Sequence, residues 1–178
     1  EPAPFDIYMA VLIGFWFILG LKISRTTGLL LAFMLVFMAG GFLSITQMET
    51  IGDAPMYLAV TLFLCLSAVF LCAIIDEDHR RLKLIFNAWT AAAVTTAMLG
   101  ILGYFKAFPG AEMFTRYDRA MGAFQDPNVF GSFLTLGALY LMHGLLTGTA
   151  RRPLMALAGL LIIVAGIFLS FSRGSWAG

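Results

Sequence analysis

Three arginines in the second half of the chain have the residue type and the placement that suit an anionic ligand. Arg116 and Arg119 lie three residues apart and would share one face if that stretch were helical. Arg173 lies further along, between Ser172 and Gly174. An arginine can bind a phosphate through two parallel hydrogen bonds. The three guanidinium groups are therefore candidates for holding a diphosphate, with Ser172 and Gly174 as supporting residues.

The sequence Asp126-Pro127-Asn128 follows the first two arginines and is typical of the start of a helix. Aspartate is a favoured N-cap residue, and proline is favoured at the first helical position. A helix start also presents unpaired backbone N–H groups that suit an anion. Asp126, Pro127 and Asn128 are therefore expected to support the site and to begin a helix beside Arg119.

A purely structural interpretation of these residues stays open beside the functional one. Arg119 could be an interfacial side chain that pairs with Asp118, Asp126 or lipid headgroups. Arg173 could extend from the end of a membrane span so that its charge reaches water. Asp126 and Pro127 could do no more than begin a helix.

The composition indicates which elements must position these residues. The chain is 61% hydrophobic and 12% charged, whereas a soluble domain is about a quarter charged. Six segments have the length and apolarity of membrane spans, which need roughly 20 residues each: 5–21, 28–45, 56–75, 84–105, 129–146 and 154–171. We expect an all-α, multi-pass bundle of about six spans with no β-sheet. Residues 1–178 would form a single integral membrane domain that belongs to a larger bundle.

The charges in the connecting segments predict an orientation. The first, third and fifth connections are basic, through Lys22, Arg25, Arg80, Arg81, Lys83, Arg151 and Arg152. The second holds Glu49 and Asp53 and no basic residue. Basic connections stay in the cytoplasm, which places the 106–128 loop and Arg173 outside. Arginines on the outer side oppose this bias, so they call for another explanation.

The pattern around these arginines resembles a known family. It reads Arg119-x-x-Gly122-x-Phe124-x-Asp126-Pro127-Asn128-x-Phe130-Gly131, followed by Ser170-x-Ser172-Arg173-Gly174. This resembles the O-antigen ligase and surface-polysaccharide polymerase family, which consists of multi-pass glycosyltransferases of the bacterial inner membrane. The resemblance covers about the last third of the chain.

The resemblance implies a reaction and its partners. Members of the family take a glycan from an undecaprenyl-diphosphate donor at the periplasmic face. They join it to lipid A core, to another glycan or to a protein, without a metal or another cofactor and without nucleic acid. The family's arginines hold the donor diphosphate, a role carried here to Arg119 and Arg173, with Arg116 added from its spacing. The family's catalytic histidine is expected beyond Gly178, so the chain would be an N-terminal or central part.

Two other classes of function stay open. A transporter for a small anion or another solute would also be a multi-pass bundle, but transporters usually place charged groups near the bilayer midplane. The charges here lie at the ends of the spans. A non-catalytic membrane scaffold would tolerate lysine at both arginine positions, whereas bidentate recognition would not.

Overall fold

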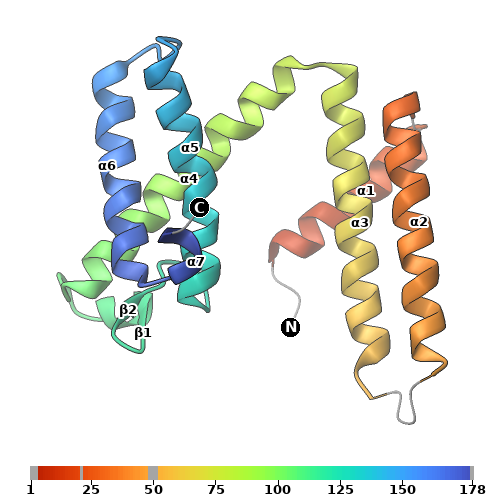
Figure 1. The fold of residues 1–178 in the computed structure, drawn as a ribbon, viewed down its shortest axis with the longest axis horizontal. Helices are drawn as coiled ribbons and strands as arrows, with labels where there is room; N and C mark the ends of the chain where they lie inside the picture. Colours follow the sequence, from red (N-terminus) through yellow and green to blue (C-terminus); the bar gives the residue numbers. More distant parts are fainter. Residues whose placement is uncertain (1–3, 21, 48–51, 177–178) are drawn as a thin grey trace. The chain divides into compact units, whose positions relative to one another are not determined.

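The computed structural model describes residues 4–20, 22–47 and 52–176, and helices dominate them (Figure 1). The long helices are α1 Pro4–Leu19, α2 Arg25–Ile45, α3 Ala54–Glu77, α4 Arg80–Tyr104, α5 Pro127–Leu146 and α6 Pro153–Ser170. Shorter elements are the 3-10 helix η1 Ala111–Phe114, the strands β1 Thr115–Arg116 and β2 Arg119–Ala120, and helix α7 Arg173–Trp176.

The helices confirm the predicted fold class of an all-α, multi-pass membrane protein. Among the described residues, α2 to α6 are long and apolar enough to cross a membrane, and α1 is a shorter apolar helix. The departure from the prediction is the antiparallel pair β1–β2, where no sheet was expected. Two other predicted features, the end of the first span at Leu21 and Glu49 in the second connection, lie outside the described residues.

Several basic residues expected in connecting segments belong to helices instead. Arg25 is the first residue of α2, and Arg80, Arg81 and Lys83 lie in the first turn of α4. Helices extend past the apolar segment because their first turn can carry charged side chains into the headgroup region. The connection between α3 and α4 is correspondingly short.

Contacts within the chain divide it into two compact units, Glu1–Leu82 and Lys83–Gly178. All three candidate arginines lie in the second unit. That the whole chain acts as a single integral membrane domain stays a prediction.

A polar cluster holds the first unit together where α2 begins. The Ser24 hydroxyl accepts a hydrogen bond from the Thr27 backbone N–H at 3.1 Å and so caps α2. Asp76, near the end of α3, accepts from the hydroxyls of Ser24 at 2.5 Å and of Thr27 at 3.0 Å. Thr27 is fully buried. These bonds fix the start of α2 against the end of α3, while Trp16 of α1 packs edge-on against Phe70 of α3.

Small residues allow close packing in the second unit. Helices α5 and α6 lie side by side, and α4 crosses them obliquely (Figure 1). A Cβ placed on Gly137 of α5 would lie 2.9 Å from the Cβ of Ala93, and one placed on Gly166 of α6 would lie 3.1 Å from the Cβ of Ala97. In lipid, small residues let helix backbones approach in this way. The glycines of the spans therefore position α4 against α5 and α6.

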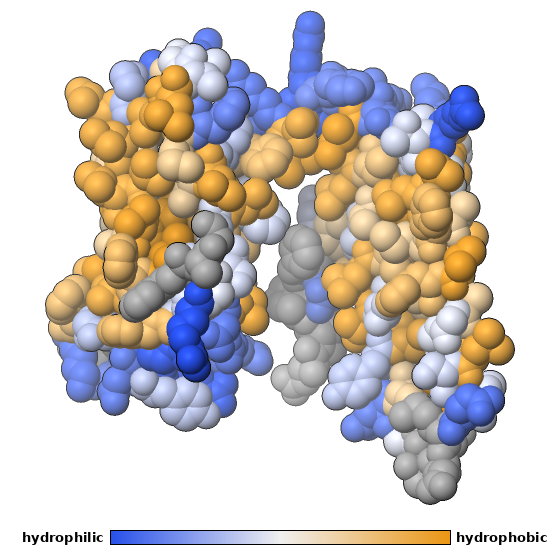
Figure 2. Space-filling model, viewed as in Figure 1, coloured by the Kyte–Doolittle hydropathy of each residue, from blue (hydrophilic) through white to orange (hydrophobic). Residues whose placement is uncertain are grey.

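On the face shown in Figure 2, the second unit is apolar along the helices and polar at their ends. Many large apolar side chains on α5 and α6 are exposed, among them Val129, Leu136, Leu139, Leu154, Leu161 and Phe168. Hydrocarbon is the natural surrounding for such a surface, since soluble proteins rarely expose large contiguous apolar patches. The polar ends are therefore the places where a ligand could be recognised through charge.

The replacement Phe130→Ala tests this packing. Phe130 is fully buried and its ring fills the space beside Gly100 and Gly122. Its loss should lower the free energy of unfolding by about 3–5 kcal/mol, measured by reversible unfolding in lipid–detergent bicelles. The matched control is Val129→Ala, because the neighbouring Val129 is 55% exposed. Equal effects of the two replacements would contradict the packing described.

Candidate functional site

The two loop arginines lie on a β-hairpin. Arg116 pairs with Arg119 directly across β1 and β2. The two residues between them, Tyr117 and Asp118, have φ values of 55° and 54°, as a type I′ turn requires. The helical arrangement considered for this stretch is therefore wrong. The arginines still lie side by side, because directly opposite residues of an antiparallel pair are neighbours.

Arg119 connects the hairpin to the ends of two membrane helices. Its Nε donates to the backbone carbonyl of Ser170, the last residue of α6, at 2.6 Å. Its Nη2 donates to Oδ1 of Asn128, in the first turn of α5, at 2.9 Å. A helix C-terminus carries partial negative charge and so attracts a cation. The guanidinium group is thus held in one place, partly buried, by groups from α5 and α6.

The hydrogen-bond partners of Arg119 are neutral, and the nearby carboxylate of Asp126 interacts with its charge without forming an ion pair. Among the described residues, the ion pairs involve only Lys22, Glu77 and Arg81. The pairing of Arg119 with Asp118 or Asp126, which the structural interpretation expected, does not form. In the described part of the chain Nη1 of Arg119 also has no hydrogen-bond acceptor. A ligand oxygen could therefore accept from this nitrogen without displacing either existing bond.

Asp126 is the N-cap of α5, as predicted. Its carboxylate accepts from the backbone N–H groups of Asn128 at 2.7 Å and Val129 at 3.3 Å, and Pro127 is the first helical residue. The bond from the Asn128 N–H, above all, holds the pKa of Asp126 below its ordinary value. These N–H groups are already occupied, so the helix start is less open to an anion than the sequence suggested.

Arg116 has a different set of partners. Its Nη1 donates to the carbonyl of Gln125 at 2.8 Å, and its guanidinium carbon lies 5.1 Å from the ring centroid of Tyr117. The side chain is exposed. Arg116 therefore ties the hairpin to the segment before α5 and lies beside Arg119 without sharing its partners.

A cluster of buried serines joins α7 to α5. The side chains of Ser170, Ser172 and Ser175 surround Gly131 of α5, where a Cβ would clash with Ser175. Ser175 Oγ donates to Ser172 Oγ at 3.1 Å, and the Ser172 backbone N–H donates to Ser170 Oγ at 3.2 Å. The predicted supporting residue Ser172 is thus a packing residue that sets where α7 begins.

The same packing leaves Arg173 on the surface. Its side chain is exposed at the start of α7, and within the described ranges it has neither a hydrogen-bond acceptor nor an ion pair. Gly174 next to it has open space where a Cβ would lie, so the fold does not require glycine there. Arg173 follows Ser170 by three residues, which places it at the same end of α6 as Arg119.

Other residues that position the hairpin could not be identified as such from the sequence. Gly122 has a φ of 55° and lies against the Thr96 carbonyl of α4, 2.7 Å from where a Cβ would be. The Ala123 N–H donates to the Thr96 hydroxyl at 3.0 Å. Phe124 packs on Phe130, with ring centroids 6.2 Å apart. The glycines of the motif were the available signal, because they indicate close approach without revealing the partner.

Comparisons of the chain with protein-family models, with curated proteins and with solved structures find no match. A functional proposal therefore depends on the fold and on the arginine cluster. The family resemblance of the segment from Arg119 to Gly174 stays an expectation from the sequence.

The pH dependence of stability tests the role of Asp126. A carboxylate whose pKa is lowered by folding stabilises the protein above its ordinary pKa, and this contribution is lost as the pH falls through the lowered value. At pH 7, Asp126→Ala should therefore lower the melting temperature in detergent, and the difference from the native protein should shrink below about pH 4. Asp126→Asn should cost less at pH 7, because asparagine is an equally good cap. A difference that stays constant down to acidic pH would refute this role.

Proposed function

We propose that this chain belongs to a membrane glycosyltransferase that uses a lipid-linked diphosphate donor. Its donor would be an undecaprenyl-diphosphate-linked glycan, which it would transfer or polymerise at the periplasmic face, as in O-antigen ligation or surface-polysaccharide synthesis. The observation that carries the proposal is the position of Arg119. Its charged group is held at the ends of α5 and α6 by neutral partners, and the exposed Arg173 follows on the same end of α6.

The arrangement suits a reaction in which a diphosphate leaves. The bond between the anomeric carbon and the diphosphate oxygen breaks, and negative charge builds up on that oxygen. A new bond forms from the acceptor hydroxyl to the anomeric carbon, and the hydroxyl proton passes to a base, which the family resemblance places beyond Gly178. Positive groups fixed before the reaction lower the energy of the developing charge most effectively. Arg119 meets this condition because its two bonds hold it in place.

The surroundings of the site suit the rest of such a donor. The site lies where α5 begins and α6 ends, and the sides of these helices expose large apolar residues, including Val129 and Phe168. A polyprenyl chain could lie in the bilayer against these helices while its diphosphate reaches the headgroup level. The acceptor glycan, lipid A core or protein would then approach from the aqueous side.

A transporter receives less support from the membrane helices. Transport pathways place polar or charged groups near the bilayer midplane, where they line a passage. Several hydroxyls within the described spans donate to a carbonyl four residues earlier in the same helix: those of Thr61, Ser67, Thr90, Thr95 and Thr135. These hydroxyls are satisfied locally and do not need a substrate.

Replacement of the arginines in the full-length protein tests the proposal. Arg173→Ala and Arg119→Lys should each reduce glycan transfer about a hundredfold, the effect of removing one stabilising donor. Lysine at position 119 cannot bond to Ser170, Asn128 and a ligand through a planar fork. Transfer is measured in proteoliposomes that contain undecaprenyl-diphosphate-linked glycan.

Lys106→Ala is the matched control, because Lys106 is an exposed cation in the same connecting segment. It should leave transfer unchanged. Since Arg119 also joins three elements, each variant is first checked for an unaltered melting temperature, and Arg173→Ala carries the test if Arg119→Lys is unstable. Full transfer by Arg173→Ala and Arg119→Lys, or an equal loss in Lys106→Ala, would refute the proposed site.

The orientation is tested by cysteine labelling in a variant that lacks Cys65 and Cys72. The side chain of Tyr117 is 76% exposed on the hairpin, and His79 is exposed in the connection between α3 and α4. With the hairpin in the periplasm, a membrane-impermeant maleimide should label Tyr117→Cys in spheroplasts and label His79→Cys only after the membrane is opened. The opposite labelling would place the arginines in the cytoplasm and exclude a periplasmic reaction.

A further inference from the structure

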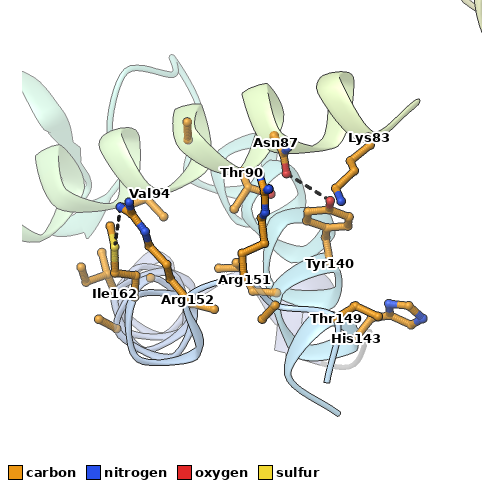
Figure 3. A pocket seen from close by; sticks show the side chains of 18 of the residues that line it. Lys83, Asn87, Thr90, Val94, Tyr140, His143, Thr149, Arg151, Arg152 and Ile162 are labelled. Atoms are coloured by element: carbon orange, nitrogen blue, oxygen red, sulfur yellow. Dashed lines mark hydrogen bonds between the residues drawn. The ribbon is translucent and has the colours of Figure 1, made fainter. Parts of the chain in front are cut away.

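A second polar feature lies at the other end of the helices that carry Arg119. The first half of α4, the end of α5 and the start of α6 line a cavity of about 1030 Å³. Three cations line it: Lys83 from α4, and Arg151 and Arg152 from the segment before α6. In Figure 3 both arginines extend from that segment toward α4. The cavity is thus a basic pocket between membrane helices.

The charges of this pocket are not balanced by the protein. None of the residues that line it is acidic. Among the described residues, Lys83 and Arg151 have no ion pair or hydrogen-bonded side-chain partner, and the guanidinium group of Arg152 reaches only the sulfur of Met155, at 3.6 Å. Like charges brought together repel one another, so an anion in the pocket would be bound favourably.

Neutral polar groups complete the same side of the pocket. The hydroxyl of Tyr140 donates to Oδ1 of Asn87 at 3.1 Å (Figure 3). This bond leaves the amide NH₂ of Asn87, which is a donor, free to face a ligand. The side of the pocket that holds the cations therefore offers hydrogen-bond donors from α4 and from the segment before α6.

Another part of the pocket wall is apolar. Val94 of α4, Leu141 of α5 and Ile162 of α6 line it, together with Met155 and Gly159. A Cβ on Gly159 would lie 3.3 Å from Leu141 and 3.4 Å from Val94, so the glycine allows the three helices to meet at this wall. A small hydrophilic anion would leave this apolar wall unused.

We propose that this pocket binds an anionic phospholipid. The phosphate would bind to Lys83, Arg151 and Arg152, and an acyl chain would lie along Val94, Leu141 and Ile162. Basic pockets between membrane helices at the headgroup level recognise anionic lipids in this way. The site is independent of the proposed glycosyltransferase activity, because it lies at the opposite end of α4, α5 and α6.

Lipid binding to the full-length protein in a mild detergent tests the proposal. Native mass spectrometry measures the affinity for phosphatidylglycerol and for phosphatidylcholine, and the native protein should prefer the anionic lipid. Arg151→Gln combined with Arg152→Gln should weaken phosphatidylglycerol binding about thirtyfold, or roughly fivefold for each charge removed near the headgroups. Arg25→Gln combined with Arg80→Gln is the matched control, because these cations do not line the pocket, and it should keep the native affinity.

Two soluble probes separate a lipid from a free anion. Inorganic phosphate and glycerol 3-phosphate carry the charge without acyl chains, so a thousandfold excess of either should leave phosphatidylglycerol bound. Displacement at comparable concentrations would overturn the proposal in favour of a soluble anion. Equal affinity for the two lipids, or equal losses in the two double variants, would overturn it as well.

Discussion

A lipid bilayer supplies no hydrogen-bond partners, and this constraint determines where chemistry can lie in the protein. Every backbone group within the hydrocarbon must be satisfied inside the chain, so the spanning segments are helices. Their unpaired backbone groups then gather at the helix ends, where water, capping side chains or ligands must satisfy them. Arg119 bonds to such a group, the carbonyl of Ser170 at the end of α6. Asp126 satisfies the corresponding N–H groups at the start of α5.

The same constraint explains which parts of the fold could be predicted from the sequence. The length and apolarity of a segment are sufficient to identify a span. The pair Asp126-Pro127 also predicts the exact residue at which α5 begins. The hairpin could not be predicted, because Tyr117-Asp118 lacks the Asn-Gly or Asp-Gly pair that usually indicates a type I′ turn. The bond from Arg119 to Ser170 could also not be predicted, since a backbone carbonyl acceptor has no signature in the sequence.

Much of the motif that resembles the glycosyltransferase family has a packing role. Gly122 and Gly131 lie where neighbouring atoms leave no space for a Cβ, and Phe130 fills the core between them. These positions build a surface on which Arg119 and Arg173 are presented. A binding site on rigid elements requires both kinds of residue, because its polar groups must be held in place by packed side chains. It also means that a match to the apolar positions alone would indicate the fold of the hairpin and not a reaction.

The cations at the two ends of the second unit have different physical origins. Basic residues such as Arg151 and Arg152 are expected at a cytoplasmic end, because they direct membrane insertion through charge alone. Directing membrane insertion needs no particular arrangement of the side chains. It therefore does not explain why Arg151 and Arg152 line the same pocket as Lys83, or why no acidic residue lines that pocket. In the predicted orientation, Arg119 and Arg173 would lie on the outer side and oppose the insertion bias, so membrane insertion would give no reason for their presence. We therefore infer a ligand beside Arg151 and Arg152 from the convergence of the cations. Beside Arg119 and Arg173 we infer one from charges that the predicted orientation would disfavour.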